Sequence, residues 1–83
     1  MTVKKTYYPE AGFTGILDAD LAYTKILMLS REGVVFNETS DNATLISGGL
    51  WYQYAPGNGN ITFNPQQGFN QGESINIVYE TNP

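Results

Sequence analysis

Apolar and polar residues alternate along several short stretches of the chain, and residues that favour turns separate these stretches. The alternation is clearest at Asn60–Phe63 and at Glu73–Tyr79. A period of two places successive side chains on opposite faces of a β-strand. Turn-forming residues recur about every eight to twelve positions, a spacing typical of small all-β folds. We therefore predict one all-β domain over residues 1–83, a small antiparallel β-sandwich or barrel-like domain of about six to seven short strands.

The same pattern places the first strands and the first hairpin. Val3–Tyr8 is the first strand candidate, and the segment Gly12–Asp20 follows it. In that segment we expect three apolar residues to be buried: Phe13, Ile16 and Leu17. Thr24–Glu38 is predicted to be a hairpin that turns at Arg31–Gly33, because β-branched residues resume directly after the glycine.

Two further hairpins are predicted in the second half of the chain. Thr44–Pro56 would be a strand that bends or bulges at Gly48 and Gly49. The Asn58-Gly59 dipeptide would connect the strand at Trp51–Tyr54 to the strand at Ile61–Phe63. The stretch Ile61–Glu80 contains two alternating runs separated by a loop of Pro, Gln, Asn and Gly, which predicts a closing hairpin.

One segment, Leu17–Leu29, also fits a helix, because Leu17, Leu21 and Met28 fall on one helical face. We prefer a strand at Thr24–Ser30, since a turn and a β-branched run follow at once. A short helical turn at Asp18–Leu21 stays open as an alternative, with an aspartate as its cap. The predicted inward-facing core residues are Ile26, Met28, Val35, Ile61, Phe63, Ile75, Ile77 and Tyr79.

Composition narrows the possible functions. The 83 residues include no cysteine and no histidine, so disulfides, the usual zinc and haem ligands and the Ser-His-Asp and Cys-His catalytic sets are excluded. Four basic residues face eight acidic ones, for a net charge of −4, which argues against nucleic acid as a partner. The longest apolar run, Ile26–Leu29, is far below the roughly 20 residues of a membrane span. We expect no enzyme activity and no cofactor.

Asp18 and Asp20 are the best-spaced pair of carboxylates. In an extended segment they would point the same way and offer oxygen ligands for a weak calcium site. We prefer a solvated turn with helix-capping aspartates, because the ligand-rich loop of a strong calcium site is absent. No metal site is therefore predicted.

The aromatic residues of one strand are the more informative candidates for binding. Tyr52 and Tyr54 share one face of the strand, and Trp51 shares the other with Gln53. One face would be the core, and the second would be a further core layer, a subunit interface or a platform on which a carbohydrate stacks. Packing in the core or between subunits is the more common use of bulky aromatic side chains.

The order of these segments resembles small β-domains of bacteriophage virion proteins, such as tail fibres, head fibres and capsid decoration proteins. The matching elements are an R-x-G turn at Arg31–Gly33, a Y-x-Y strand at Tyr52–Tyr54, a G-x-I-T-F strand ending at Asn60–Phe63 and a G-E-x-I-x-I-x-Y strand at Gly72–Tyr79. The resemblance covers roughly the last two thirds of the chain. It implies a virion protein that assembles as a homo-oligomer, with a trimer favoured.

If the resemblance holds, the loop at Asn64–Glu73 is a contact element, and a merely solvated hairpin loop is the alternative. Its amide side chains at Gln66, Gln67 and Asn70 offer donors and acceptors without the desolvation cost of full charges. Phe69 has no obvious core of its own and is predicted to be an exposed apolar anchor. A short chain without disulfides also has a thin core, which independently favours oligomerisation.

These observations give two functional hypotheses. The first is a non-enzymatic structural or accessory protein of a bacteriophage virion, which binds copies of itself and other virion structural proteins. The alternative is a small carbohydrate- or host-surface-binding module that uses the exposed aromatic residues Trp51, Tyr52 and Tyr54.

Overall fold

Seven strands form one curled, barrel-like sheet in the computed structural model, which describes residues 1–81. In sheet order the strands are β1 (Thr2–Tyr7), β7 (Ile75–Glu80), β3 (Lys25–Arg31), β4 (Val34–Glu38), β5 (Trp51–Ala55), β6 (Asn60–Thr62) and β2 (Gly15–Leu17). The helical segments are one 3-10 turn, η1 (Ala19–Leu21), and one short α-helix, α1 (Asn42–Leu45). The prediction of a small all-β, barrel-like domain is confirmed.

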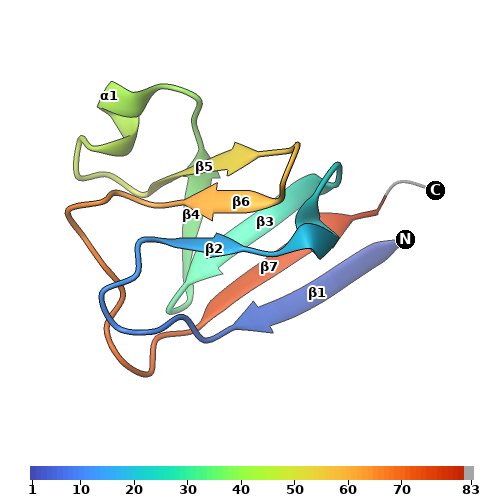
Figure 1. The fold of residues 1–83 in the computed structure, drawn as a ribbon, viewed down its shortest axis with the longest axis horizontal. Coiled ribbons are helices and arrows are strands. Elements are labelled where there is room, and N and C mark those ends of the chain that lie inside the picture. The colour runs from blue at the N-terminus through green and yellow to red at the C-terminus, as the bar shows by residue number, and fades with distance from the viewer. Residues whose placement is uncertain (82–83) are drawn as a thin grey trace.

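The sheet curls so that its two ends face each other. Figure 1 shows β5, β6 and β2 passing in front of β4 and running at an angle to the diagonal strands β3, β7 and β1. We call the first group the β2 half and the second group, with β4, the β1 half. The halves join where β4 and β5 pair in parallel, at Asn37 with Trp51 and Glu38 with Tyr52. The sheet is therefore mixed, and the expectation of a wholly antiparallel sheet is wrong.

Two of the predicted hairpins are present. Glu32 and Gly33 connect β3 to β4 with φ values of 52° and 78°, the positive pair that a two-residue type I′ turn requires. Between β5 and β6, Gly59 has a φ of 73° and its N–H donates to the Ala55 carbonyl. The Asn58 side chain accepts from the amide of Asn60, as expected of an N-G turn.

The predicted closing hairpin at Ile61–Glu80 is wrong. β6 pairs with β5 and β2, whereas β7 pairs with β3 and β1. The loop between them carries the chain from the β2 half to the β1 half (Figure 1). Alternation shows which side chains of a strand share a face, but it does not identify the neighbouring strand.

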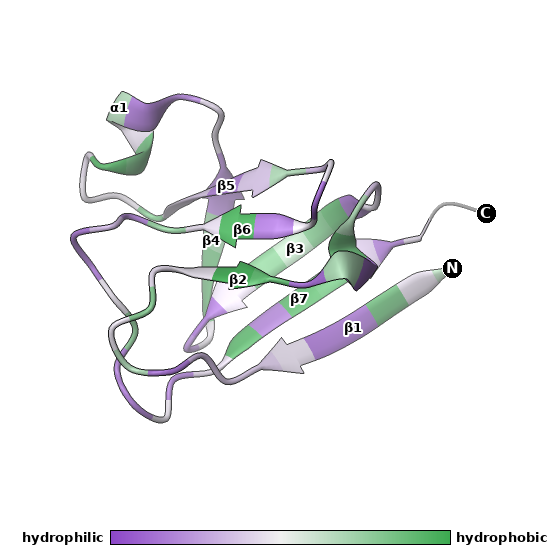
Figure 2. Ribbon diagram, in the orientation of Figure 1, coloured by the Kyte–Doolittle hydropathy of each residue, from purple (hydrophilic) through white to green (hydrophobic). Residues whose placement is uncertain are grey.

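The hydrophobic core fills the space between the two halves. It consists of Ile16, Leu21, Leu29, Tyr52, Ile61, Phe63, Phe69, Ile75, Ile77 and Tyr79. Figure 2 shows hydrophobic and hydrophilic residues alternating along the first part of β7, as expected for a strand with one buried face. Burial is confirmed for the predicted residues Ile16, Ile61, Phe63, Ile75, Ile77 and Tyr79, and half-buried Ile26 packs against them.

Four residues expected in the core are exposed: Phe13, Leu17, Met28 and Val35. A bulge in β3 explains Met28, because Ile26 pairs with Tyr79 but Met28 pairs with Val78. The extra residue, Leu27, resets the alternation, so Ile26 and Leu29 face inward. Val35 lies on the opposite face of β4 from the core-packed Phe36.

Two further segments differ from simple strands. Thr44–Pro56 is not one bent strand, because α1 and a turn with Gly48 at a φ of 92° precede β5. The alternative of a short helical turn at Asp18–Leu21 is confirmed. Asp18 caps η1 by accepting a hydrogen bond from the Asp20 amide at 2.9 Å.

The strand preferred at Thr24–Ser30 is confirmed as β3.

Candidate interaction surfaces

Phe69, the predicted apolar anchor of the loop, lies in the core. Its side chain is only 2% exposed, and its ring packs edge-on against Phe63 with centroids 5.3 Å apart. The backbone on either side is tied to the segment before β2, where Phe69 N–H donates to Phe13 C=O and Gly12 N–H donates to Phe69 C=O. The prediction of an exposed anchor is wrong, and Phe69 fastens the loop to the protein.

The aromatic residues of β5 are also largely structural. Tyr52 is 4% exposed, and burial followed by the nearby Glu38 charge raises the pKa of its hydroxyl to about 12. The half-buried Tyr54 hydroxyl donates to the Leu21 carbonyl at 2.6 Å and accepts from the Thr24 amide at 3.1 Å, which holds η1 against β5. The side of β5 that carries these tyrosines therefore packs inward. Trp51, on the other side, is half-buried.

The amide residues of the loop lie at the surface. Gln66, Gln67 and Asn70 are all exposed, as a contact element would need. The loop that presents them is held at its centre by Arg31, whose guanidinium donates to the carbonyls of Gln67 and Gly68 at 3.3 and 3.2 Å. The three amide side chains therefore lie on one anchored loop. Trp51 belongs to a different element, β5.

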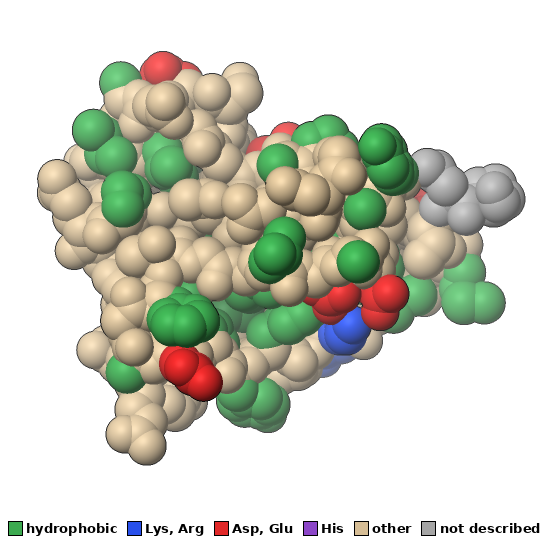
Figure 3. Space-filling model, viewed as in Figure 1, with side chains coloured by type: hydrophobic (Ala, Val, Ile, Leu, Met, Phe, Trp, Pro, Cys, Tyr) green, Lys and Arg blue, Asp and Glu red, His purple; other side chains and the backbone are tan. Residues whose placement is uncertain are grey.

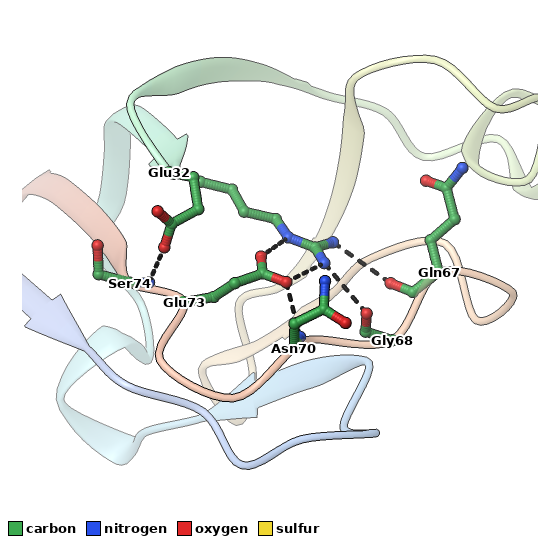
Figure 4. A network of polar contacts seen from close by, with 7 residues as sticks. Glu32, Gln67, Gly68, Asn70, Glu73 and Ser74 are labelled. Atoms are coloured by element: carbon green, nitrogen blue, oxygen red, sulfur yellow. Dashed lines mark hydrogen bonds and ion pairs between the residues drawn. The ribbon is translucent and has the colours of Figure 1, made fainter.

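We refer to Arg31 and Glu73 as the loop clamp. Arg31 Nε and Nη2 donate to the two carboxylate oxygens of Glu73 at 2.6 and 3.2 Å, and both side chains are largely buried. The guanidinium also lies over the Phe69 ring, 4.6 Å from its centroid. Figure 4 shows Glu73 and the Gln67 and Gly68 carbonyls converging on it. Hydrogen bonds from Arg31 hold the pKa of Glu73 below its ordinary value.

A second polar cluster bridges the two ends of the sheet, where β1 faces β2. Lys5 Nζ donates to Asp18 at 2.6 Å and to Asp20 at 3.1 Å, and the Tyr7 hydroxyl donates to Asp18 at 2.7 Å. Partial burial acts to raise the pKa of Asp18, but these hydrogen bonds outweigh it and lower that pKa. The ammonium group of Lys5 therefore occupies the place between the two aspartates that was considered for calcium.

Beside this cluster, the open seam between β1 and β2 forms a cleft of about 260 Å³. Its walls carry Tyr8, Phe13 and Leu17, which are between 55% and 74% exposed, and Glu10 lies at its rim. Figure 3 shows this face of the molecule hollowed, with hydrophobic side chains inside and around the hollow. Sequence reasoning missed the cleft, because Phe13 and Leu17 were expected in the core.

The outer face of the β1 half carries a second apolar surface. Val78 lies directly opposite Met28, and Val35 is the diagonal neighbour of Met28 on β4. Leu27, the bulged residue, extends the strip. Leu27, Met28 and Val35 are between 43% and 52% exposed. We call Leu27, Met28, Val35 and Val78 the outer strip.

A second concavity is polar. It has a volume of about 360 Å³ and lies where the chain after β4 diverges from β5. Hydroxyl, amide and carboxylate groups line it, from Glu38, Thr39, Ser40, Gln53, Asn60 and Thr62.

Within residues 1–81, no group of three or more acidic side chains is placed to hold a metal ion, and every buried side-chain nitrogen or oxygen has a hydrogen-bond partner. That part of the chain also contains no helix of the length and apolarity that a membrane crossing requires.

Comparison with known proteins found no match to any family model, to any curated protein or to any solved structure. The resemblance to bacteriophage virion proteins therefore still rests on the sequence elements alone.

Proposed function

We propose that this protein is a non-enzymatic structural or accessory component of a bacteriophage virion, which acts by self-association and by attachment to other virion proteins. The homo-oligomer favoured by the resemblance is a trimer. The observation that carries the proposal is the outer strip, a contiguous apolar surface on a sheet face that nothing in residues 1–81 covers. Contiguous exposed apolar patches mark contact surfaces in small soluble proteins.

A second copy of the chain is the occupant that suits the outer strip. The same face carries charges of both signs, because Lys25 and Glu80 are cross-strand partners and Lys4 lies opposite Val78. A face with an apolar centre and mixed charges at its margin can meet copies of the same face around a symmetry axis without bringing like charges together. Burial between copies would also supplement the thin core of a 9.2 kDa chain.

Sedimentation velocity over the micromolar range tests this self-association. We expect the parent protein to sediment as an oligomer and Met28→Lys to sediment as a monomer, because the lysine places an unpaired charge at the centre of the contact. Ile46→Lys is the matched control, since Ile46 is similarly exposed but follows α1 at a distance from the outer strip. A parent that stays monomeric throughout, or a control that dissociates equally, would contradict the proposal.

The polar concavity favours a second candidate, a small carbohydrate-binding module. Neutral amides and hydroxyls with one carboxylate, Glu38, suit a polyol ligand. Of the three aromatic residues first considered for this role, half-buried Tyr54 lines the concavity, half-buried Trp51 lies on the other side of β5, and Tyr52 is buried. Glycan-array screening of the monomeric Met28→Lys variant separates this candidate from the first.

A further inference from the structure

The seam between β1 and β2 exposes two strand edges with free backbone groups. Met1 C=O accepts a hydrogen bond from Thr81 N–H. Because Met1 and Thr81 continue the β1–β7 register, the backbone N–H and C=O groups of every second residue from Met1 onward point to β7. The N–H and C=O groups of Thr2, Lys4 and Thr6 therefore point to the open edge. On β2, Phe63 N–H donates to Thr14 C=O, so the backbone groups of Thr14 point to β6. The backbone N–H and C=O groups of Gly15 and Leu17 therefore point to the open edge.

The β2 edge is the better place for an added strand. It opens into the apolar cleft, which Gly15 and Leu17 line. Tyr8, Phe13 and Leu17 stand around this edge and offer pockets for the alternate side chains of an extended peptide. The β1 edge carries Lys4 and Lys5, and charged edge strands discourage pairing with another strand.

We propose that the cleft between β1 and β2 binds an extended segment of a different protein, which adds to the β2 edge as a strand. The segment would carry apolar residues at alternate positions and a basic residue at the end that lies near Glu10. The carboxylate of Glu10 lines the cleft and, among the described residues, has no hydrogen-bond or ion-pair partner. Asp18 and Asp20 are already paired with Lys5, so Glu10 is the charge left for the ligand.

Charge argues against a second copy as the occupant. A β2 strand from another copy would bring no basic residue to Glu10, because residues 10–20 contain no lysine or arginine. A β1 strand from another copy would bring Lys4 and Lys5, and charged edge strands discourage pairing with another strand. The chain as a whole is also acidic. This inference names the surface for the attachment part of the proposed function and rests on that part, but it does not require self-association.

Fluorescence anisotropy with the monomeric Met28→Lys variant tests the inference independently of oligomerisation. The probe is a short fluorescein-labelled peptide in which valine and threonine alternate between terminal lysines. We expect saturable binding, which Leu17→Pro weakens by about tenfold or more because it removes one outward N–H and leaves the β2–β6 ladder intact. Leu17→Val, which keeps that N–H, should bind nearly as the parent does.

Two further measurements keep the test independent of how Leu17→Pro folds. The same peptide with alternate amides N-methylated should lose binding to the unmodified cleft, and Glu10→Lys should weaken binding of the unmethylated peptide. Equal binding of methylated and unmethylated peptides, or no binding of either, would overturn the inference. Self-association of the Met28→Lys variant that Leu17→Pro abolishes would also overturn it, since the occupant would then be a second copy.

Discussion

At the scale of single residues, Arg31 connects β3 to the loop before β7. The residue ends β3, with its side chain on the inward face, and its guanidinium contacts Glu73, two loop carbonyls and the Phe69 ring. A planar group with several fixed donors suits this site, because the loop clamp needs a bidentate bond and two further donors at once. Arg31 thus acts together with buried Phe69 to hold the loop that presents Gln66, Gln67 and Asn70.

Removing one partner of the loop clamp should destabilise the protein more than removing both. We expect Arg31→Met to lower the free energy of unfolding by about 3 kcal/mol, because Glu73 is left largely buried without its counter-charge. Adding Glu73→Gln should recover part of that loss, since glutamine still accepts from the Asn70 amide. Urea unfolding at neutral pH measures both changes.

Lys4→Met, made in the monomeric Met28→Lys protein because Lys4 borders the outer strip, is the control for the loop clamp. It removes a cation from the exposed surface of β1 and should change stability by less than about 0.5 kcal/mol. If Arg31→Met proved equally mild, or if the double variant were less stable than Arg31→Met alone, the clamp would not hold the loop as described.

The burial of Phe69 could not be predicted from the sequence around it. Its neighbours in the chain are Gln, Asn and Gly, so local pattern indicates an exposed loop. Its burial depends on Arg31, Phe63 and Phe13, which come from distant parts of the chain. Phe63 and Ile77, by contrast, sit in strands whose alternation already separates the inward side from the outward side, and their burial was predictable.

At the scale of elements, local chemistry determines turns well and strand partners poorly. The turns at Glu32-Gly33 and Asn58-Gly59 were predictable, because both need a residue that tolerates positive φ. The bulge at Leu27, the parallel pairing of β4 with β5 and the separation of β6 from β7 were not. These features depend on how the sheet curls to close the core, and no short stretch of sequence specifies that curvature.

Gly59 is required both for the β5–β6 turn and for the close packing of that turn against the backbone around η1. A Cβ there would lie 2.1 Å from the Asp18 carbonyl oxygen and 2.9 Å from the Ala22 amide nitrogen, so the β5–β6 turn packs directly against the backbone around η1. Gly12 has a similar positive φ of 88° but no atom within 4 Å of the added Cβ. The two glycines form a matched pair that separates backbone strain from close packing.

We expect Gly12→Ala to cost about 1 kcal/mol of unfolding free energy, which is the strain of a left-handed alanine. Gly59→Ala should cost at least about twice as much, because the turn must also move away from η1. Thermal and urea unfolding of the two variants measure the difference. Equal losses would show that the turn does not rest on η1.

At the scale of the whole molecule, two ionic contacts close the fold at separate places. The loop clamp fastens the connection between the β2 half and the β1 half, and the Lys5–Asp18 contact bridges the open seam. Residues 1–81 provide no disulfide and no group of side chains placed to bind a metal. The stability of this small sheet should therefore depend on the ionisation of the two carboxylates.

The sign of that dependence follows from the direction of the two pKa shifts. Arg31 lowers the pKa of Glu73 below the ordinary value of 4.5, and Lys5, the Asp20 amide and Tyr7 lower that of Asp18 below 3.8 despite its partial burial. A carboxylate with a lowered pKa in the folded state contributes stability that is fully present above its unfolded pKa. That contribution disappears as the pH falls through the folded pKa.

We therefore expect the urea midpoint of the parent protein to decline as the pH falls below about 4.5, the ordinary glutamate value. The Asp18→Asn, Glu73→Gln double variant should be less stable than the parent at pH 7, because both contacts lose their charge. It should also lose less on acidification, because neither side chain can take up a proton. Urea titrations of both proteins, from neutral pH to about pH 2.5, cover the range in which the contribution is lost. An equally steep decline of the urea midpoint with falling pH in the two proteins would show that other groups govern acid unfolding.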